Sequence, residues 1–404
     1  MAAPQQAIRF VFDRYEVLAA ENRVIFEYVM EYDGHPPERF REILTLPWVS
    51  SEAWTRISPA LLRNVLQTTH LALGLSYWKM ACPGQLVVKE GSLSPEQIAF
   101  WETIYTKGLG EFYYKNKIDF RNLVHFEAVL DKPSKPVKYA AKKTCLVPIG
   151  GGKDSALTVQ LLQEGGSSFD AFTMGTSHIQ ESFTNALGVP WRQVERQLDP
   201  LMIARSKDEE VYNGHVPVSL FYTFTGMLTA VLEGYQALIF SNEKSANIGN
   251  VQYLGMEINH QWSKTLECEL LVREYLKAFV TPSLEVFSLL RPLHEIEIMR
   301  RFVQYGKYFS LVSSCNRNFV VSSTQPKAER GAYWWGACPK CAFVFPLFAA
   351  FLPKETVCEI FGKNLFADEA LLPLFQELLG LRGIKPFECV GLPEEVLVAF
   401  AEAH

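Results

Sequence analysis

The sequence predicts an α/β protein centred on a doubly wound parallel sheet, and three features of the chain support this class. Between residues 139 and 312, apolar segments with strand composition alternate with helical segments. One of these strands runs into a glycine-rich turn that opens a helix. Polar residues gather directly after another strand, where doubly wound folds bind their ligands. The 404 residues suffice for two or three domains, and we expect an α+β domain at 1–138, the α/β domain at 139–312 and a mainly helical region at 313–404.

The first domain is expected to combine short strands with two helices. Gly74 should end the first helix, because glycine often follows the last helical residue. Ser94 and Pro95 favour an N-cap and a first turn for the second helix. Two prolines within 132–136 predict a linker. We expect strands at 8–12 and 24–29 and helices at 60–73 and 95–106.

The second domain carries the alternation of strands and helices. Gly165 and Gly188 each follow a helical segment and predict its end. The strands should lie parallel, because helical crossovers connect them. We expect strands at 146–149, 169–174, 193–198, 237–240 and 284–289, and helices at 156–164, 177–187 and 217–232.

Composition and charge limit the classes of function. The chain has 48% hydrophobic and 21% charged residues, as is typical of soluble globular proteins. Its net charge of −5 argues against a nucleic-acid groove as the main surface. The apolar stretch 220–240 contains threonines, Glu233 and Gly234, so we expect a buried helix and strand there rather than a membrane span. The first residues lack the features of a signal peptide, and we expect a cytoplasmic protein whose eight cysteines are mostly reduced.

The run Gly-Gly-Gly-Lys-Asp-Ser at 150–155 is the most informative stretch of the chain. Glycines let the backbone turn tightly and bring its N–H groups close to a ligand. The following helix points its partly positive N-terminus at the same place. These features predict a cradle for an anion, most often a phosphate. The run is not a Walker A loop, because Lys153 is followed by Asp154 instead of Ser or Thr.

The same run resembles the PP-loop of the ATP pyrophosphatase superfamily, whose pattern is Ser-Gly-Gly-x-Asp-Ser. Gly150 stands at the position of the first serine, so one hydroxyl contact is lost while the backbone amides remain. The resemblance implies that the α/β domain has a PP-loop (HUP-like) fold and cleaves ATP to AMP and diphosphate. The alternative is a glycine-rich turn without a ligand, which accounts less well for the Lys-Asp-Ser that follows.

A second polar constellation occupies 241–250 and 257–267, directly after the strand expected at 237–240. His260 and Lys264 lie four residues apart and would share one face of a helix. Side chains of these types transfer protons or bind carboxylates. The alternative is a solvated loop, which explains any single residue but not the combination of Asn, Gln, His, Lys and Glu with Gly and Trp.

Three cysteines form a third feature, with Cys315 preceding the pair Cys338 and Cys341. A Cys-x-x-Cys pair with a distant third cysteine is typical of a metal site, but structural zinc needs four ligands. Some PP-loop relatives, the 7-cyano-7-deazaguanine synthases, have a further cysteine three residues before such a pair, where this chain has Trp335. We therefore expect reduced thiols that pack together, with a zinc site as the alternative. The remaining cysteines are expected to be core or indifferent thiols, namely Cys82, Cys145, Cys268, Cys358 and Cys389.

Taken together, these segments resemble one family, the UDP-N-acetylmuramoyl-L-alanyl-L-glutamate epimerases of bacterial cell-wall synthesis. The resemblance rests on 150–155, 213–217, 242–247, 259–264 and 338–343, and on 75–79, 100–101 and 108–112 in the first domain. The family usually has a cysteine at the position of Trp335. The resemblance implies inversion of the terminal L-glutamate of UDP-MurNAc-L-Ala-L-Glu to D-glutamate, with ATP cleaved to AMP and diphosphate. Adenylation would remove a charge from the carboxylate and make the neighbouring α-proton easier to release.

ATP and Mg²⁺ are the cofactors that the resemblance implies. Asp154 is expected to hold magnesium, and Lys153 and Ser155 to neutralise phosphate charge. The candidate catalytic residues are Lys153, Asp154, Lys244, His260 and Lys264. The candidate nucleotide-binding residues are Gly150, Gly151, Gly152, Lys153, Asp154, Ser155, Thr173 and Met174. The candidate substrate-binding residues are Arg205, His215, Glu243, Asn247, Asn250 and Asn259.

Two other classes of function stay open at this stage. One is a PP-loop ligase or amidotransferase that captures the adenylate with an amine, although no glutaminase-like segment is evident. The other is a sensor that binds ATP without chemistry. The acidic charge and the absence of a basic segment disfavour an enzyme that thiolates tRNA. We expect a small-molecule substrate as the partner, neither nucleic acid nor membrane, and the sequence does not give the oligomeric state.

Overall fold

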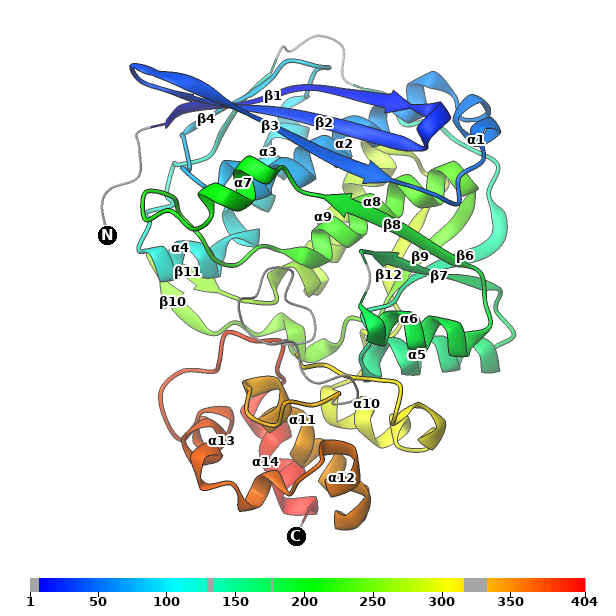
Figure 1. Cartoon of the computed structure of the whole chain (residues 1–404), viewed down its shortest axis with the longest axis vertical. Coiled ribbons are helices and arrows are strands. Elements are labelled where there is room, and N and C mark those ends of the chain that lie inside the picture. The colour runs from blue at the N-terminus through cyan, green and yellow to red at the C-terminus, as the bar shows by residue number, and fades with distance from the viewer. Residues whose placement is uncertain (1–6, 129–133, 176, 316–332, 404) are drawn as a thin grey trace.

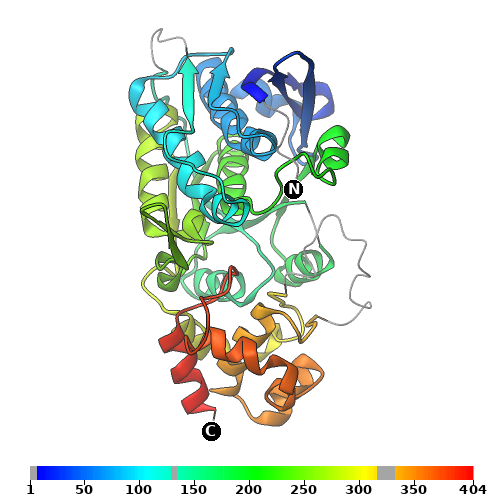
Figure 2. The same cartoon turned by 90° about the vertical axis from the view of Figure 1, so that its left-hand side faces the viewer.

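The computed structural model describes residues 7–128, 134–175, 177–315 and 333–403. Its centre is a single ten-stranded sheet with the order β12-β9-β6-β7-β8-β3-β2-β1-β4-β5. Figures 1 and 2 show the N-terminal strands at one end of the molecule and the C-terminal helices at the other. The predicted α/β class is therefore confirmed, with a sheet larger than the sequence indicates.

The N-terminal strands form one half of this sheet. Strands β1 (Ala7–Leu18), β2 (Arg23–Tyr32) and β3 (His35–Thr45) are antiparallel, and β4 (Gln85–Val88) and β5 (His125–Ala128) extend the sheet in parallel. The strands predicted at 8–12 and 24–29 lie inside β1 and β2, whereas β3 was missed. Two prolines and a charged surface face weaken the apolar signal of β3, which buries Phe40, Glu42 and Leu44.

The parallel half of the sheet has the predicted doubly wound arrangement. It consists of β6 (Lys142–Pro148), β7 (Phe169–Met174), β8 (Trp191–Gln197), β9 (Tyr235–Phe240) and β12 (Glu285–Ser288). Numbered in chain order, these strands lie as 3-2-1-4-5, so the order reverses between β6 and β9. Doubly wound sheets bind ligands at such a reversal, outside the carboxyl ends of the strands. Antiparallel pairing of β3 with β8 joins this half to the N-terminal strands, and the division at residue 138 stays a prediction.

Helices cover the sheet on both faces. Those predicted are α2 (Pro59–Trp78), α3 (Pro95–Gly108), α5 (Lys153–Glu164), α6 (His178–Leu187) and α8 (Val218–Glu233). Those not predicted are α1 (Ser51–Arg56), α4 (Gly110–Asn116), α7 (Pro200–Arg205), α9 (Leu266–Tyr275) and α10 (Glu295–Phe302). The helical C-terminal region is confirmed by α11 (Pro339–Ala349), α12 (Lys354–Phe361), α13 (Leu372–Leu378) and α14 (Pro393–Glu402). A short hairpin of β10 (Val251–Tyr253) and β11 (Met256–Ile258) lies within the predicted polar segment.

The prediction that Gly74 ends the first helix is wrong, because α2 continues to Trp78. A Cβ added at Gly74 would lie 2.4 Å from Phe12 Cε1 and 2.8 Å from Tyr28 Cε1. The glycine therefore allows α2 to pack closely on β1 and β2. Contact with the sheet, rather than the end of a helix, explains this glycine.

Alternating residues of the central strand β6 face two apolar cores. Leu146 belongs to the core shared with the N-terminal strands and α8, whereas Val147 and Ile149 belong to the core shared with the C-terminal helices. Among the described residues, none of the helices is both long and apolar enough to cross a membrane. The linker predicted at 132–136 lies partly outside the described residues.

Candidate active site

The glycine cradle forms the turn between β6 and α5. Gly151 has a φ of 84°, which glycine adopts without strain, and its carbonyl accepts a hydrogen bond of 2.9 Å from the Ser313 N–H. A Cβ at Gly152 would lie 2.8 Å from Ser314 Oγ, whereas a Cβ at Gly150 would meet nothing within 4 Å. The turn is therefore braced by residues 313 and 314 and open beside Gly150.

The start of α5 is suited to an anion. Among the described residues, no side chain caps this helix, whereas in α6 the Ser177 hydroxyl accepts a hydrogen bond of 3.3 Å from the Gln180 N–H. The first N–H groups of α5 are thus left for a ligand, and the helix dipole favours negative charge there. Ser155 Oγ donates to the Gly152 carbonyl at 3.0 Å, which fixes the hydroxyl at the same turn. This geometry fits the phosphate group that the sequence predicts.

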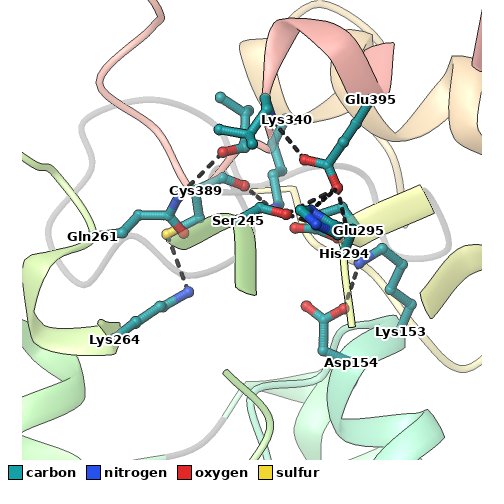
Figure 3. Close-up of polar contacts among 12 residues, drawn as sticks. Lys153, Asp154, Ser245, Gln261, Lys264, His294, Glu295, Lys340, Cys389 and Glu395 are labelled. Atoms are coloured by element: carbon teal, nitrogen blue, oxygen red, sulfur yellow. Dashed lines mark hydrogen bonds and ion pairs between the residues drawn. The ribbon is translucent and has the colours of Figure 1, made fainter. Parts of the chain in front are cut away.

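Three carboxylates meet beside the cradle. One oxygen from each of Asp154, Glu243 and Glu295 lies within 4.8 Å of the other two. Lys153 is buried and pairs with both Asp154 and Glu295 (Figure 3). Burial raises the pKa of Glu243 and of Glu295, whereas for Asp154 the nearby Lys153 and Lys340 outweigh burial and lower the pKa. A group of carboxylate oxygens at a phosphate-binding turn fits Mg²⁺.

A thiol, an imidazole and a carboxylate form a second group. Lys264 Nζ donates to Cys389 Sγ at 3.2 Å (Figure 3), and His260 acts electrostatically on the same thiol. His260 Nδ1 also contacts Glu111 Oε2, and His215 Nδ1 lies 3.3 Å from that oxygen. Glu111 comes from α4 and Cys389 from the loop before α14, so the fold assembles this group from distant parts of the chain.

The members of this group stabilise one another's charges. Burial raises the pKa of Cys389, but Lys264 and His260 outweigh burial and hold it well below its ordinary value. Burial lowers the pKa of His260, but the bonds to Cys389 and Glu111 outweigh it and raise the pKa to about 9. Burial raises the pKa of Glu111, but His260 outweighs it and the pKa falls to about 2. These interactions together favour the thiolate of Cys389, the imidazolium of His260 and the carboxylate of Glu111.

The loop that carries Cys389 is tied to the rest of the site. Lys340 Nζ donates to the Cys389 carbonyl. Asn250 Nδ2 donates to the Pro386 carbonyl at 2.9 Å, and Asn250 Oδ1 accepts a hydrogen bond of 2.9 Å from the His260 N–H. One asparagine thus positions both His260 and the C-terminal loop.

Several predicted residues support the site without facing its charged groups. Asn247 and Asn259 hold the polar segment through hydrogen bonds to its backbone. Lys244 is exposed. Arg205 Nε lies 3.0 Å from Glu38 Oε1, beside β3. The catalytic or substrate-binding roles assigned to these residues stay predictions.

Thr173 and Met174 end β7, beside the strand that carries the cradle. Thr173 is buried and its hydroxyl accepts a hydrogen bond of 3.0 Å from Trp191 Nε1. The Met174 carbonyl lies 3.4 Å from the Tyr222 hydroxyl. Their position at the carboxyl edge of the sheet suits the adenine contact that the resemblance implies, and that contact stays a prediction.

The cysteines of the third feature lie together in the core. Cys338 Sγ is 3.9 Å from Cys315 Sγ and 3.3 Å from Cys341 Sγ. The Gly336 N–H donates to Cys341 Sγ at 3.3 Å. Hydrogen bonding with Cys315 raises the pKa of Cys338 to about 11, which favours thiols over thiolates in the absence of a metal. The structure brings the three sulfurs together, and whether zinc joins them stays a prediction.

Two expectations about the polar residues are corrected by the structure. His260 and Lys264 do not share a helical face, because 260–261 form a turn before a 3₁₀-helix at Trp262–Lys264. Their side chains nevertheless converge on Cys389, which was expected to be an indifferent thiol. The sequence reasoning also missed Glu111, Glu295 and Lys340. Glu111 lies in a segment used for the family resemblance, whereas a lone cysteine in a C-terminal loop gives no local signal.

Comparison with known proteins identifies the family of this chain. The MurL N-terminal domain matches residues 1–289, and the MurL C-terminal domain matches residues 311–404. A Salinispora tropica protein named UDP-N-acetyl-alpha-D-muramoyl-L-alanyl-L-glutamate epimerase is 36% identical over 97% of this chain and 84% of its own length. A Micromonospora protein of the same name is 36% identical over 97% of this chain and 86% of its own length. A third protein of this name, from Xanthomonas oryzae pv. oryzae, is 34% identical over 84% of this chain and 74% of its own length. The chain therefore belongs to the MurL family.

Proposed function

We propose that this protein inverts the terminal L-glutamate of UDP-MurNAc-L-Ala-L-Glu to D-glutamate, and that it does so by cleaving ATP to AMP and diphosphate. Relatives that span most of the chain carry the name of this epimerase. The observation that carries the ATP step is the uncapped N-terminus of α5 beside three carboxylates. The use of ATP and of a nucleotide-linked precursor agrees with the cytoplasmic location expected from the sequence.

The first step would activate a carboxylate. A carboxylate oxygen of the terminal glutamate attacks the α-phosphorus of ATP, and diphosphate leaves as the acyl–AMP bond forms. The amides of the cradle bind the departing phosphates, and Lys153 balances the buried charge of Asp154 and Glu295. Bound Mg²⁺ would neutralise phosphate charge, with Asp154, Glu243 and Glu295 as the residues placed to hold it.

The second step would move the α-proton. A free carboxylate makes its neighbouring C–H a poor acid, because deprotonation places two negative charges side by side. Adenylation removes one charge, so the α-proton can leave and a proton can return to the opposite face. Lys264, which acts electrostatically on Asp154, and His260 are the proton carriers of this proposal. Water then cleaves the acyl bond and releases AMP and the D-glutamyl product.

The proposal is tested by running the reaction in heavy water. With ATP and magnesium, the D-glutamyl product should carry deuterium at Cα, and each turnover should release AMP and diphosphate. Neither inversion nor exchange should occur without ATP, and added pyridoxal phosphate should change nothing. Inversion without nucleotide would overturn the adenylation step. A protein that binds ATP but releases no diphosphate with the muramoyl dipeptide would be a sensor.

A further inference from the structure

We propose that Cys389 is a catalytic nucleophile that takes the activated glutamyl group from AMP as a thioester before the α-proton moves. This inference rests on the proposed function, because it requires an acyl-adenylate. It adds a covalent intermediate and a residue from the C-terminal loop to the reaction.

The arrangement around Cys389 is that of an activated nucleophile. His260 acts electrostatically on the thiol and is in turn held by Glu111. A nucleophile, a base and a group that orients the base form the common pattern of covalent catalysis in acyl transfer. Lys264 Nζ, 3.2 Å from Sγ, adds a positive charge that favours the thiolate. A merely structural thiol needs neither an oriented imidazole nor a buried lysine.

The thiol and the cradle belong to one site. Lys264 and Lys340 act electrostatically on both Asp154 at the cradle and Cys389 in the C-terminal loop. Lys340 is also hydrogen-bonded to the Cys389 carbonyl, so the same side chain positions the loop and faces the carboxylates. Figure 3 shows Cys389 and Lys264 at the left of the site and Lys153 and Asp154 at the right. An acyl group activated at the cradle would therefore form within the electrostatic reach of the thiolate.

The proposed step balances without a further reactant. The Cys389 thiolate attacks the carbonyl carbon of the acyl-adenylate, a C–S bond forms, and the C–O bond to AMP breaks with its electron pair leaving on AMP. The α-proton is then lost and regained while the acyl group is a thioester. Water finally adds to the carbonyl, the C–S bond breaks, and the thiolate is restored.

Thioester formation would also make the two proton carriers more acidic. The thiolate helps to keep both His260 and Lys264 protonated. Once sulfur is acylated, that negative charge disappears, and either group gives up its proton more easily. The α-carbon of a thioester is two bonds from sulfur, so groups that contact Sγ lie next to the α-proton. Inversion needs two proton carriers; Lys264 contacts this sulfur, and His260 acts electrostatically on it.

The test separates adenylation from acyl transfer. Exchange of labelled diphosphate into ATP, dependent on the muramoyl dipeptide, reports adenylation, and release of AMP reports the next step. Mass spectrometry of acid-quenched full-length protein reports the thioester, as the mass of the substrate minus one water. The variants are Cys389→Ala and Cys389→Ser, with Cys358→Ala on α12 as the matched control.

We expect Cys389→Ala to retain diphosphate exchange, which also shows that the variant is folded. AMP release and epimerisation should both fall by about 10³-fold or more. The wild type should carry an adduct on the peptide containing Cys389 that neutral hydroxylamine removes, Cys389→Ser should carry a hydroxylamine-resistant ester, and Cys358→Ala should behave as wild type. AMP release at the wild-type rate by Cys389→Ala, or epimerisation above about a tenth of the wild-type rate, would overturn the thioester. Absence of diphosphate exchange in the wild type would instead overturn the proposed function.

Discussion

At the scale of single residues, Lys153 has a structural role and, in the proposed function, a role at the phosphates. It is buried between Asp154 and Glu295, and removing one member of a buried ion pair leaves the other charge unpaired. We expect Lys153→Met to lower the free energy of unfolding by about 3–5 kcal/mol, measured by urea denaturation. The double variant Lys153→Met/Glu295→Gln should recover most of that loss.

Activity should not follow this recovery of stability. Substrate-dependent AMP formation should fall by about 10²-fold or more in both variants, because the charge beside the phosphates is missing. Asp154→Asn should lose AMP formation to a similar extent while remaining folded. Normal turnover in a stable Lys153→Met/Glu295→Gln protein would show that Lys153 serves the fold alone.

Glu111 should control the protonation of His260. Its carboxylate is one of the groups that raise the pKa of His260 to about 9, together with Cys389. If catalysis uses the protonated imidazole beside the thiolate, kcat/KM falls above that pH. Removing the Glu111 charge lowers the pKa of His260, so in Glu111→Gln the alkaline limb of the pH profile should move to lower pH.

The comparison for this prediction is Glu267→Gln, which removes a carboxylate that pairs with Lys107. The other titratable groups around His260 and Glu111, namely Cys389, Lys115 and His215, are unchanged in both variants. The alkaline limb should stay at the wild-type pH in Glu267→Gln. An unshifted limb in Glu111→Gln would exclude His260 as the group that titrates there.

At the scale of elements, α2 depends on a glycine for its contact with the sheet. Gly74→Ala would place a Cβ 2.4 Å from Phe12 Cε1, which neither ring nor helix can accept without moving. We expect a loss of about 1–3 kcal/mol in the free energy of unfolding. Gly110→Ala is the matched control, because its Cβ would meet Ile258 at an ordinary 3.5 Å. Equal stability of the two variants would contradict the close packing at Gly74.

Loops, more than helices, position the side chains of the candidate active site. The cradle, the polar segment after β9 and the loop before α14 all lie outside the strands that support them. Asn250 links two of these loops by bonding to both His260 and the Pro386 carbonyl. Rigid strands thus fix the places where the loops start, and side-chain to backbone hydrogen bonds fix the loops themselves.

At the scale of the whole molecule, the sheet joins the N-terminal strands to the parallel strands through β3 and β8. His70 lies in the N-terminal core, where its Nε2 is 3.0 Å from the Glu27 carbonyl and burial lowers its pKa to about 3. The unfolded chain binds a proton near pH 6.5, whereas the folded protein resists protonation until about pH 3. Stability from the neutral ring is therefore present above pH 6.5 and lost as the pH falls toward 3.

The expected loss over this range is on the order of 4 kcal/mol from this one residue. His70→Phe should weaken the dependence of the unfolding free energy on pH between 7 and 4, whatever its effect at neutral pH. His125→Phe changes an exposed ring and should leave the dependence as in the wild type. Because one sheet spans both halves, the protection factors against hydrogen exchange in β2 and β6 should fall together in acid. A fall confined to β2 would show that the halves unfold separately.

The sequence by itself determined the features that depend on neighbours along the chain. Glycine spacing located the cradle at 150–155, and alternation of apolar segments gave the five parallel strands and their helices. The family resemblance came from short motifs of the same kind, and the domain matches confirm it. Strand β3 was missed because it begins with His-Pro-Pro and four of its eleven residues are charged.

Only the tertiary structure decided which polar groups meet. Glu111, His260 and Cys389 come from α4, a turn after β11 and a C-terminal loop, and no local pattern relates residues so far apart. The same holds for Glu295, which reaches Lys153 from the start of α10. Ionisation follows from burial and from the distance between charges, and both are set by the fold. Cys389, a lone cysteine in its stretch of sequence, thus gains in the structure a lysine 3.2 Å from its sulfur, and this lysine and His260 favour its thiolate.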